Sequence, residues 1–210
     1  MLLFKSIMKF ICIGRNYAEH AKELNNPLPS EPVIFIKPDT ALLPNKGTLY
    51  LPEYSNDVHY EIELIFKVCL EGKFIQPEYA LKYVNQISVG IDFTARDVQE
   101  ECKKKGLPWT KAKCFNGSAA VGEFIPVSEI HDLKNISFEL YQNGQIKQQG
   151  NSVMMLFDVP AIISYISTIM TLKRGDIIFT GTPAGVGKTN ANDTLTGYLG
   201  GKKLLEIQVQ

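Results

Sequence analysis

The segment from Asp57 to Cys69 constrains the fold more than any other part of the chain, because its side chains alternate in character over its whole length. One parity is apolar and comprises Val58, Tyr60, Ile62, Leu64, Phe66 and Val68. The other parity is mostly polar or charged and comprises Asp57, His59, Glu61, Glu63, Ile65 and Lys67. A period of two over this length predicts one long β-strand with an apolar face.

Strand patterns outnumber helical patterns in the rest of the chain. We expect short strands over residues 10–13, 33–36, 87–91, 177–180 and 204–209, and a hairpin that turns at Asn143-Gly144. We expect helices over residues 16–24, 94–105 and 159–170. Thr94 and Asp97 resemble a capping box, Gly106 suits a C-cap, and Asp158 suits an N-cap. Because strands do not alternate regularly with helices, we predict a β-rich α+β domain rather than a doubly wound sheet.

Composition narrows the class of protein. The 210 residues fit a single domain, residues 1–210. The 22 basic residues equal the 22 acidic ones, which argues against a nucleic-acid partner because such binders carry a basic excess. The longest apolar stretch, residues 159–170, is too short to span a bilayer, so no membrane partner is expected. Four scattered cysteines without a CxxC pair fit neither a zinc site nor a disulfide framework, and we expect a cytoplasmic location.

The polar face of the segment 57–69 carries Glu61 and Glu63, which point the same way on a strand. Two carboxylates brought to about 5 Å repel each other by roughly 3 kcal/mol at an effective dielectric constant near 20. A divalent cation would offset this repulsion, and oxygen ligands favour Mg²⁺, Mn²⁺ or Ca²⁺ over zinc. The alternative is a solvated outer face of an antiparallel sheet. Asp92 ends an apolar strand and is the natural third ligand, although an isolated aspartate there more often caps a turn.

Two other pairs of polar residues have helical spacing. Arg96 and Gln99 share a helix face, so Arg96 can bind a substrate carboxylate or, alternatively, pair with Glu100. His20 and Glu23 have the same spacing, which lets a carboxylate orient an imidazole and raise its basicity. The alternative for this second pair is an ordinary surface contact.

A glycine-rich segment, residues 181–189, invites comparison with a phosphate-binding loop. A Walker A motif requires a glycine five residues before Gly187, and Thr182 occupies that position. The residues that follow, 190–193, are also a poor helix start. We therefore predict that the chain does not bind a nucleotide here.

Taken in order, these residues resemble the fumarylacetoacetate hydrolase superfamily, specifically its short single-domain branch of acylpyruvate hydrolases and oxaloacetate decarboxylases. The motifs that carry the resemblance are Gly14-Arg-Asn-Tyr17 with His20 and Glu23, His59-x-Glu61-x-Glu63, Asp92-Phe-Thr-Ala-Arg-Asp-Val-Gln99, Gly106-Leu-Pro-Trp-Thr110 followed by Lys113, and Leu172-x-x-Gly-Asp176 leading into Thr180-Gly-Thr-Pro-x-Gly-Val-Gly187. Each motif alone is modest, but their order along the chain is highly specific.

The resemblance implies a fold, a metal site and a set of catalytic residues. The implied fold is a mixed β-sandwich roll with short peripheral helices, assembled as a homodimer, in which residues 14–26 form a lid helix segment. The implied ligands of Mg²⁺ or Mn²⁺ are Glu61, Glu63 and Asp92. The implied catalytic residues are His20, Glu23 and Lys113, and the implied substrate-binding residues are Arg96, Gln99 and Thr182.

The chemistry that follows from this resemblance concerns a small 2-oxo acid. Our leading hypothesis is a metal-dependent hydrolase that cleaves the C–C bond of acylpyruvate-type 2,4-dioxo acids, giving pyruvate and a carboxylic acid through a metal-stabilised enolate. In this hypothesis His20 and Glu23 activate the attacking water. The alternative is an oxaloacetate decarboxylase or tautomerase, or a 2-hydroxy-diene-dioate isomerase, at the same site. A cation-binding domain without catalysis is a further alternative.

Overall fold

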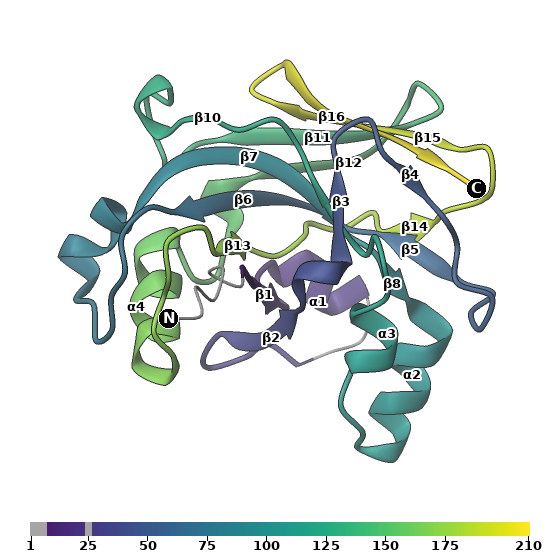
Figure 1. Ribbon diagram of the computed structural model, residues 1–210, viewed down its shortest axis with the longest axis horizontal. Helices are drawn as coiled ribbons and strands as arrows, with labels where there is room; N and C mark the ends of the chain where they lie inside the picture. The colour runs from purple at the N-terminus through teal and green to yellow at the C-terminus, as the bar shows by residue number, and fades with distance from the viewer. Residues whose placement is uncertain (1–7, 24–26) are drawn as a thin grey trace, which may run out of the picture.

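A computed structural model describes residues 8–23 and 27–210, and strands dominate it (Figure 1). The largest sheet has eight strands in the order β2-β1-β13-β6-β7-β9-β3, with β10 paired to β7. Its members are β1 (Phe10–Gly14), β2 (Val33–Lys37), β3 (Leu42–Pro44), β6 (Ile62–Val68), β7 (Val84–Asp92), β9 (Ala119–Val121), β10 (Ile125–Pro126) and β13 (Ile177–Phe179). The pairs β1–β13 and β3–β9 are parallel and the other pairs, such as β6–β7, are antiparallel, so the sheet is mixed.

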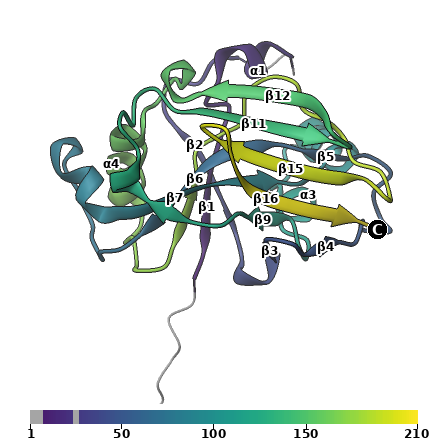
Figure 2. The same cartoon turned by 90° about the horizontal axis from the view of Figure 1, so that it is seen from above.

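A second sheet covers one face of the first. It has five strands, which are β12 (Gln145–Asn151), β11 (Ser137–Gln142), β15 (Thr194–Leu199), β16 (Lys202–Val209) and β4 (Thr48–Leu49). Figures 1 and 2 show β11, β15 and β16 lying across β6 and β7. The two sheets approach closely at Gly197, where a Cβ atom would lie 3.0 Å from Val89 and 3.2 Å from Ile62. The buried core lies between these layers, and the predicted β-rich sandwich is confirmed.

The predicted long strand from Asp57 to Cys69 is wrong in one respect, because the chain changes partners at Glu61. It forms β5 (Val58–Tyr60) in a three-stranded sheet with β8 (Thr94–Ala95) and β14 (Gly187–Lys188), and then β6 in the main sheet. At the junction, the Ile62 amide donates a hydrogen bond to the side-chain oxygen of Gln148 at 2.9 Å instead of to a backbone carbonyl of a neighbouring strand. The solvated-face alternative is also wrong, since Glu61, Glu63 and Ile65 are all buried.

The helices are short and peripheral, as predicted (Figure 1). They are α1 (Ala18–Glu23), α2 (Arg96–Lys105), α3 (Thr110–Lys113) and α4 (Val159–Ile169), with 3₁₀ turns η1 (Asp39–Ala41), η2 (Pro77–Tyr83), η3 (Val127–Glu129) and η4 (Ser152–Met154). Of the predicted helix 16–24 and lid segment 14–26, residues 24–26 lie outside the described part of the chain. Among the described residues, no helix combines the length and the apolar character needed to cross a membrane.

The local signals at helix ends and turns have mixed outcomes. The Asp158 carboxylate caps α4 by accepting from the Ala161 amide at 2.9 Å, as predicted. Gly106 ends α2 with a left-handed φ of 65°, also as predicted. The Asn143-Gly144 hairpin turn between β11 and β12 is present, with φ values of 53° and 77°.

The predicted capping box at Thr94 and Asp97 is wrong. Residues 94–95 form β8, and α2 begins at Arg96 without a side-chain cap. The Thr94 hydroxyl instead accepts a hydrogen bond from Lys113 at 2.6 Å. The glycine-rich segment 181–189 leads into β14 and not into a helix, in agreement with the rejected phosphate-binding loop.

Candidate metal centre and active site

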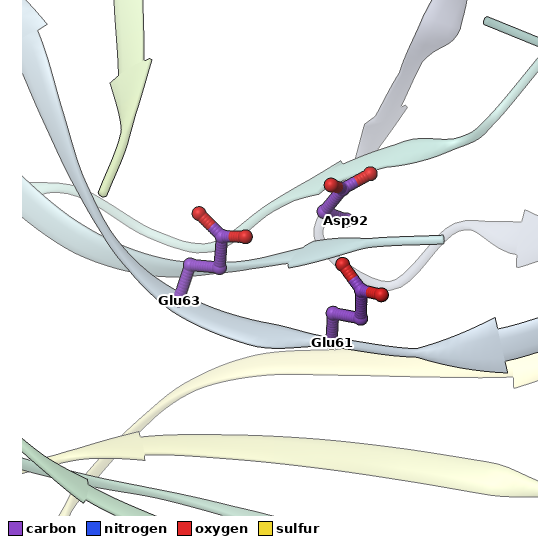
Figure 3. Close-up of side chains that lie close together, drawn as sticks. All are labelled: Glu61, Glu63 and Asp92. Carbon is purple, nitrogen blue, oxygen red and sulfur yellow. The ribbon is translucent and has the colours of Figure 1, made fainter. Parts of the chain in front are cut away.

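Three carboxylates meet where β6 begins and β7 ends (Figure 3). Glu61 occupies the β5–β6 junction, Glu63 lies on β6, and Asp92 is the last residue of β7. The Asp92 amide donates to the Glu61 carbonyl at 2.9 Å, which places the two side chains at the same end of the strand pair. One oxygen from each carboxylate lies within 4.8 Å of the others, and the three residues are only 4%, 2% and 1% exposed. The structure therefore brings together the three residues that the sequence predicts as metal ligands.

The three acids differ in their electrostatic surroundings. Burial, together with the charges of Asp92 and Glu61, raises the pKa of Glu63 well above its ordinary value, although the Gly181 amide donates to it at 2.6 Å. Burial would also raise the pKa of Glu61, but Lys113 and Arg96 outweigh that effect and hold it well below its ordinary value. Among the described residues, Glu63 is thus the one of the three carboxylates that forms no ion pair with a cation.

Two cations, both predicted from the sequence, neutralise the other acids. The buried Lys113 ammonium donates to Glu61 at 2.8 Å and to Asp92 at 2.6 Å. Burial would lower the pKa of Lys113, but Asp92 and Glu61 raise it, so the group stays charged. Arg96 pairs with the Glu61 carboxylate and donates to the Gln99 side chain at 2.6 Å.

Lys37 is a third cation, and the sequence analysis missed it. Its side chain is fully buried at the end of β2, where the ammonium pairs with Asp92. It also donates to the Phe93 carbonyl at 3.1 Å and to the Ser118 carbonyl at 2.6 Å. The only signal in the sequence is a lysine that directly follows the apolar run of β2, where a charge is costly to bury without partners.

The chemistry of this donor set fits a divalent cation. The three carboxylates offer oxygen atoms only, as Mg²⁺ and Mn²⁺ prefer. Asp92 Oδ1 forms an ion pair with the Lys37 ammonium, and a carboxylate oxygen has a second lone pair with which it can bind a cation. Glu63 is buried against two other carboxylates, an arrangement that a cation would relieve. The residues that would hold the cation are therefore Glu61, Glu63 and Asp92.

A histidine–carboxylate pair faces this centre from α1. His20 is 6% exposed and lines the same pocket, and its Nδ1 lies 3.1 Å from Glu23 Oε2. The Glu23 carboxylate also accepts from the Gly185 amide at 3.1 Å. At the other end of α1, the Asn16 side chain donates to the Phe157 carbonyl at 3.0 Å and to the Thr180 carbonyl at 2.8 Å. The pair is thus held from both ends of the helix.

The pocket enclosed by these groups is small, with a volume of about 30 Å³. Eight of the nine predicted site residues line the pocket, and Glu23 lies behind His20. The lining residues are Ile13, Gly14, Arg15, His20, Phe35, Glu61, Glu63, Asp92, Arg96, Gln99, Lys103, Trp109, Lys113 and Thr182.

Comparison with known proteins places these features in a family. Residues 9–209 match the family model described as fumarylacetoacetate (FAA) hydrolase C-terminal. The chain is 44% identical to a mitochondrial oxaloacetate tautomerase of Bos taurus over 200 residues, covering 95% of this chain and 90% of that protein. It is 46% identical to a mitochondrial oxaloacetate decarboxylase of Dictyostelium discoideum over 180 residues, covering 85% of this chain and 83% of that protein.

A solved structure agrees with these matches. The fumarylpyruvate hydrolase from Pseudomonas aeruginosa, solved in complex with Mn²⁺ and pyruvate, superposes with a TM-score of 0.91 at 33% sequence identity. The alignment covers 97% of this chain and 89% of that chain. The similarity therefore extends over nearly the whole chain.

Proposed function

The chain belongs to the fumarylacetoacetate hydrolase family, and from that membership we propose that it interconverts the keto and enol forms of oxaloacetate with the help of Mg²⁺ or Mn²⁺. One observation carries the proposal: a carboxylate-oriented imidazole, His20, opens onto the same buried pocket as three carboxylates and the charged Lys113. A base and a set of cationic groups on one pocket are what enolisation next to a carbonyl requires.

The relatives support one of the hypotheses drawn from the sequence more than the other. Two relatives above 40% identity are named for oxaloacetate chemistry, one a tautomerase and one a decarboxylase. The hydrolase hypothesis finds support at 33% identity, in the fumarylpyruvate hydrolase structure. We therefore place oxaloacetate first and acylpyruvate hydrolysis behind it, which reverses the order of the sequence analysis.

In this proposal His20 carries the proton. With a hydrogen bond from His20 Nδ1–H to the Glu23 carboxylate, the Nε2 lone pair is free to take a proton from C3 of the substrate. The protonated ring then returns a proton to the C2 oxygen, which completes the conversion from ketone to enol. Glu23 stabilises the imidazolium between these two steps, as a carboxylate partner does in general acid–base catalysis.

The other pocket residues bind the substrate and stabilise charge. A divalent cation at Glu61, Glu63 and Asp92 supplies Lewis-acid polarisation of the 2-oxo group when it is bound. Lys113 keeps its proton and so offers a positive charge to the oxygen on which negative charge develops. Arg96, which Glu61 and Gln99 orient, is placed to bind a carboxylate. Thr182 accepts from Gln148 at 2.9 Å, which leaves its hydroxyl proton available for a substrate oxygen.

Decarboxylation of the same substrate is the second candidate, favoured by the 46% identity to the decarboxylase. Breaking the C3–C4 bond releases CO₂ and leaves its electron pair in the enolate of pyruvate. His20 in its protonated form then delivers a proton to C3. The same residues serve both reactions, so the two candidates differ in which bond to C3 is broken.

An assay that follows both reactions tests the proposal. The protein is mixed with freshly dissolved enol oxaloacetate and Mg²⁺, and the enol absorbance and the pyruvate formed are recorded together. We expect fast loss of enol absorbance without matching pyruvate, and loss of this activity in EDTA. Pyruvate formed in step with the enol decay would instead support the decarboxylase, and no effect on either signal would contradict both.

His20 is tested separately by substitution. We expect His20→Gln to slow the reaction by about 10²–10⁴-fold, the usual contribution of a general acid–base group. Mg²⁺ affinity measured by calorimetry should stay close to that of the wild type, since His20 is not a ligand. Glu19→Gln is the matched control, because Glu19 is exposed on the same helix and pairs with the exposed Lys22. Unchanged turnover in His20→Gln would refute the assigned role.

A further inference from the structure

Two cations on the pocket wall have no part in the chemistry described above. Arg15 follows β1, and Lys103 lies on α2, and both line the pocket together with Arg96. Among the residues that the structure describes, no carboxylate forms an ion pair with either side chain. Arg15 and Lys103 therefore bring two positive charges to the pocket that are not in ion pairs with its carboxylates.

The backbone at Arg15 is held in an unusual conformation. Its φ of 61° is in the left-handed region, which non-glycine residues adopt rarely and often at functional sites. The neighbouring Asn16 is fixed by hydrogen bonds to Phe157 and Thr180. Gly181 packs so tightly here that a Cβ atom would lie 2.7 Å from Asn16. These contacts fix the backbone that follows Arg15, and Arg15 itself lines the pocket.

Lys103 differs from its two lysine neighbours on α2. Its ammonium lies 6.0 Å from the centre of the Trp109 ring, which also lines the pocket, whereas Lys104 and Lys105 are exposed. Partial burial and the charges of Arg96 and Arg15 lower the pKa of Lys103. The three cations therefore repel one another, and an anion between them would relieve the repulsion.

The charges of the site indicate which anion fits. The three carboxylates of the metal centre are equalled in number by three buried cations, Lys37, Arg96 and Lys113, which form ion pairs with Glu61 and Asp92. A divalent cation, Arg15 and Lys103 would then leave the loaded pocket strongly positive. A monoanionic 2-oxo acid supplies one carboxylate, which the metal centre and Arg96 take up, so a second carboxylate is needed to reach the other two cations.

We infer that Arg15 and Lys103 form a subsite for the distal carboxylate of the substrate, and that they select dianionic 2-oxo acids over monoanionic ones. This inference rests on the proposed function for its substrate, oxaloacetate, which carries two carboxylates. The subsite is a specificity determinant, and it leaves the proton transfer to His20.

The test compares kcat/KM for oxaloacetate, a dianion, with kcat/KM for acetylpyruvate, a monoanion. Lys103→Met removes the charge and keeps an unbranched chain beside Trp109. We expect kcat/KM to fall about tenfold for oxaloacetate, mainly through KM, and by less than about twofold for acetylpyruvate. Lys103→Arg should restore most of the loss. Lys104→Met, which alters an exposed lysine of the same helix, should change neither value.

Arg15→Gln is expected to shift the same ratio in the same direction, with urea unfolding as a check that the fold persists. An equal fall for both substrates in Lys103→Met, or no fall for oxaloacetate, would overturn the subsite.

The subsite and the proposed function fail in distinguishable ways. If the wild type does not process oxaloacetate, the proposed function is wrong, and fumarylpyruvate, also a dianion, replaces oxaloacetate in the comparison. If it processes none of these compounds, calorimetric binding of oxaloacetate to the Mg²⁺-loaded wild type and Lys103→Met decides. In either case, kcat/KM or binding affinity for the dianion that is about tenfold lower in Lys103→Met than in the wild type supports the subsite. Equal values of that quantity in the two proteins contradict it.

Discussion

At the scale of single residues, Lys37 holds the end of β7 in place. Its ammonium is fully buried, forms an ion pair with Asp92 and donates hydrogen bonds to the carbonyls of Phe93 and Ser118. Lys37→Met would leave a buried carboxylate and two carbonyls without this partner. We expect a loss of about 3–5 kcal/mol in the free energy of unfolding, measured with urea. Lys147→Met, at an exposed lysine of β12, should change it by less than about 0.5 kcal/mol. A loss below 1 kcal/mol in Lys37→Met would contradict this account.

Glu63 makes the stability of the metal-free protein depend on pH. Because its pKa is raised in the folded state, its contribution to stability is present at low pH and is lost as pH rises through that value. Glu63→Gln removes the titration and keeps an oxygen for the Gly181 amide. In EDTA we expect Glu63→Gln to raise Tm at pH 9 by about 2–4 °C, the shift that corresponds to roughly 1 kcal/mol, and by less at pH 5. The opposite order of the two shifts would contradict the assignment.

How far the site is predictable depends on the residue. Glu61, Glu63 and Asp92 could be proposed from spacing, because the polar parity of one strand and the end of another are visible in the sequence. Lys37 and Lys103 could not be proposed from the sequence. The role of Lys37 depends on Asp92, which is distant in sequence, and the role of Lys103 depends on the pocket wall that the fold assembles. Arg15 lies in a recognisable motif, but only the fold reveals its positive φ and its place in the pocket.

At the scale of elements, the close packing of β6, β7 and β9 fixes the metal centre. Gly90 pairs with Glu63 across β6 and β7, and a Cβ atom there would lie 2.7 Å from the Ala120 carbonyl and 2.8 Å from Phe179. We expect Gly90→Ala to cost about 1–3 kcal/mol in unfolding free energy and to weaken Mg²⁺ binding.

The control for this substitution is Gly200→Ala. Gly200 also has a constrained backbone, with φ of 54°, but a Cβ atom there has open space around it. Gly200→Ala should therefore lower the free energy of unfolding by about 1 kcal/mol through backbone strain, and it should leave Mg²⁺ affinity unchanged. Calorimetry and thermal unfolding measure both quantities, and unchanged Mg²⁺ affinity in Gly90→Ala would contradict the packing argument.

The predictable part of each element follows from its local contacts. The Asp158 cap of α4 and the Asn143-Gly144 turn were predictable because the groups involved lie within three residues of one another. The break at Glu61 was not, because the Ile62 amide is satisfied by Gln148, 86 positions away. The wrong prediction of a capping box at Thr94 has a similar cause, since the Thr94 hydroxyl accepts a hydrogen bond from the Lys113 ammonium.

At the scale of the whole molecule, binding of the cation should stabilise the fold. A ligand present at 100 times its Kd adds about 2.7 kcal/mol, which corresponds to a rise of about 5–10 °C in Tm for a domain of this size. We expect this rise with Mg²⁺ or Mn²⁺ in the wild type and in Lys147→Met, and its loss in Asp92→Asn. An equal rise in Asp92→Asn would show that the cation binds elsewhere.

Two whole-molecule expectations stay predictions. A homodimer would be detected as twice the chain mass by light scattering on a sizing column, and a single-chain mass at micromolar concentration would contradict it. A cytoplasmic location also stays a prediction, and the Bos taurus and Dictyostelium relatives are named as mitochondrial.

The central claim is that His20 moves a proton at C3 of oxaloacetate in the pocket of Glu61, Glu63 and Asp92. Its most direct test is the exchange of the C3 hydrogens for deuterium, followed by proton NMR in deuterated buffer with Mg²⁺. We predict that the wild type accelerates this exchange by about 10²-fold or more over Mg²⁺ alone, and that His20→Gln loses the acceleration. Exchange at the same rate in His20→Gln as in the wild type, or no acceleration by the wild type, would contradict the claim.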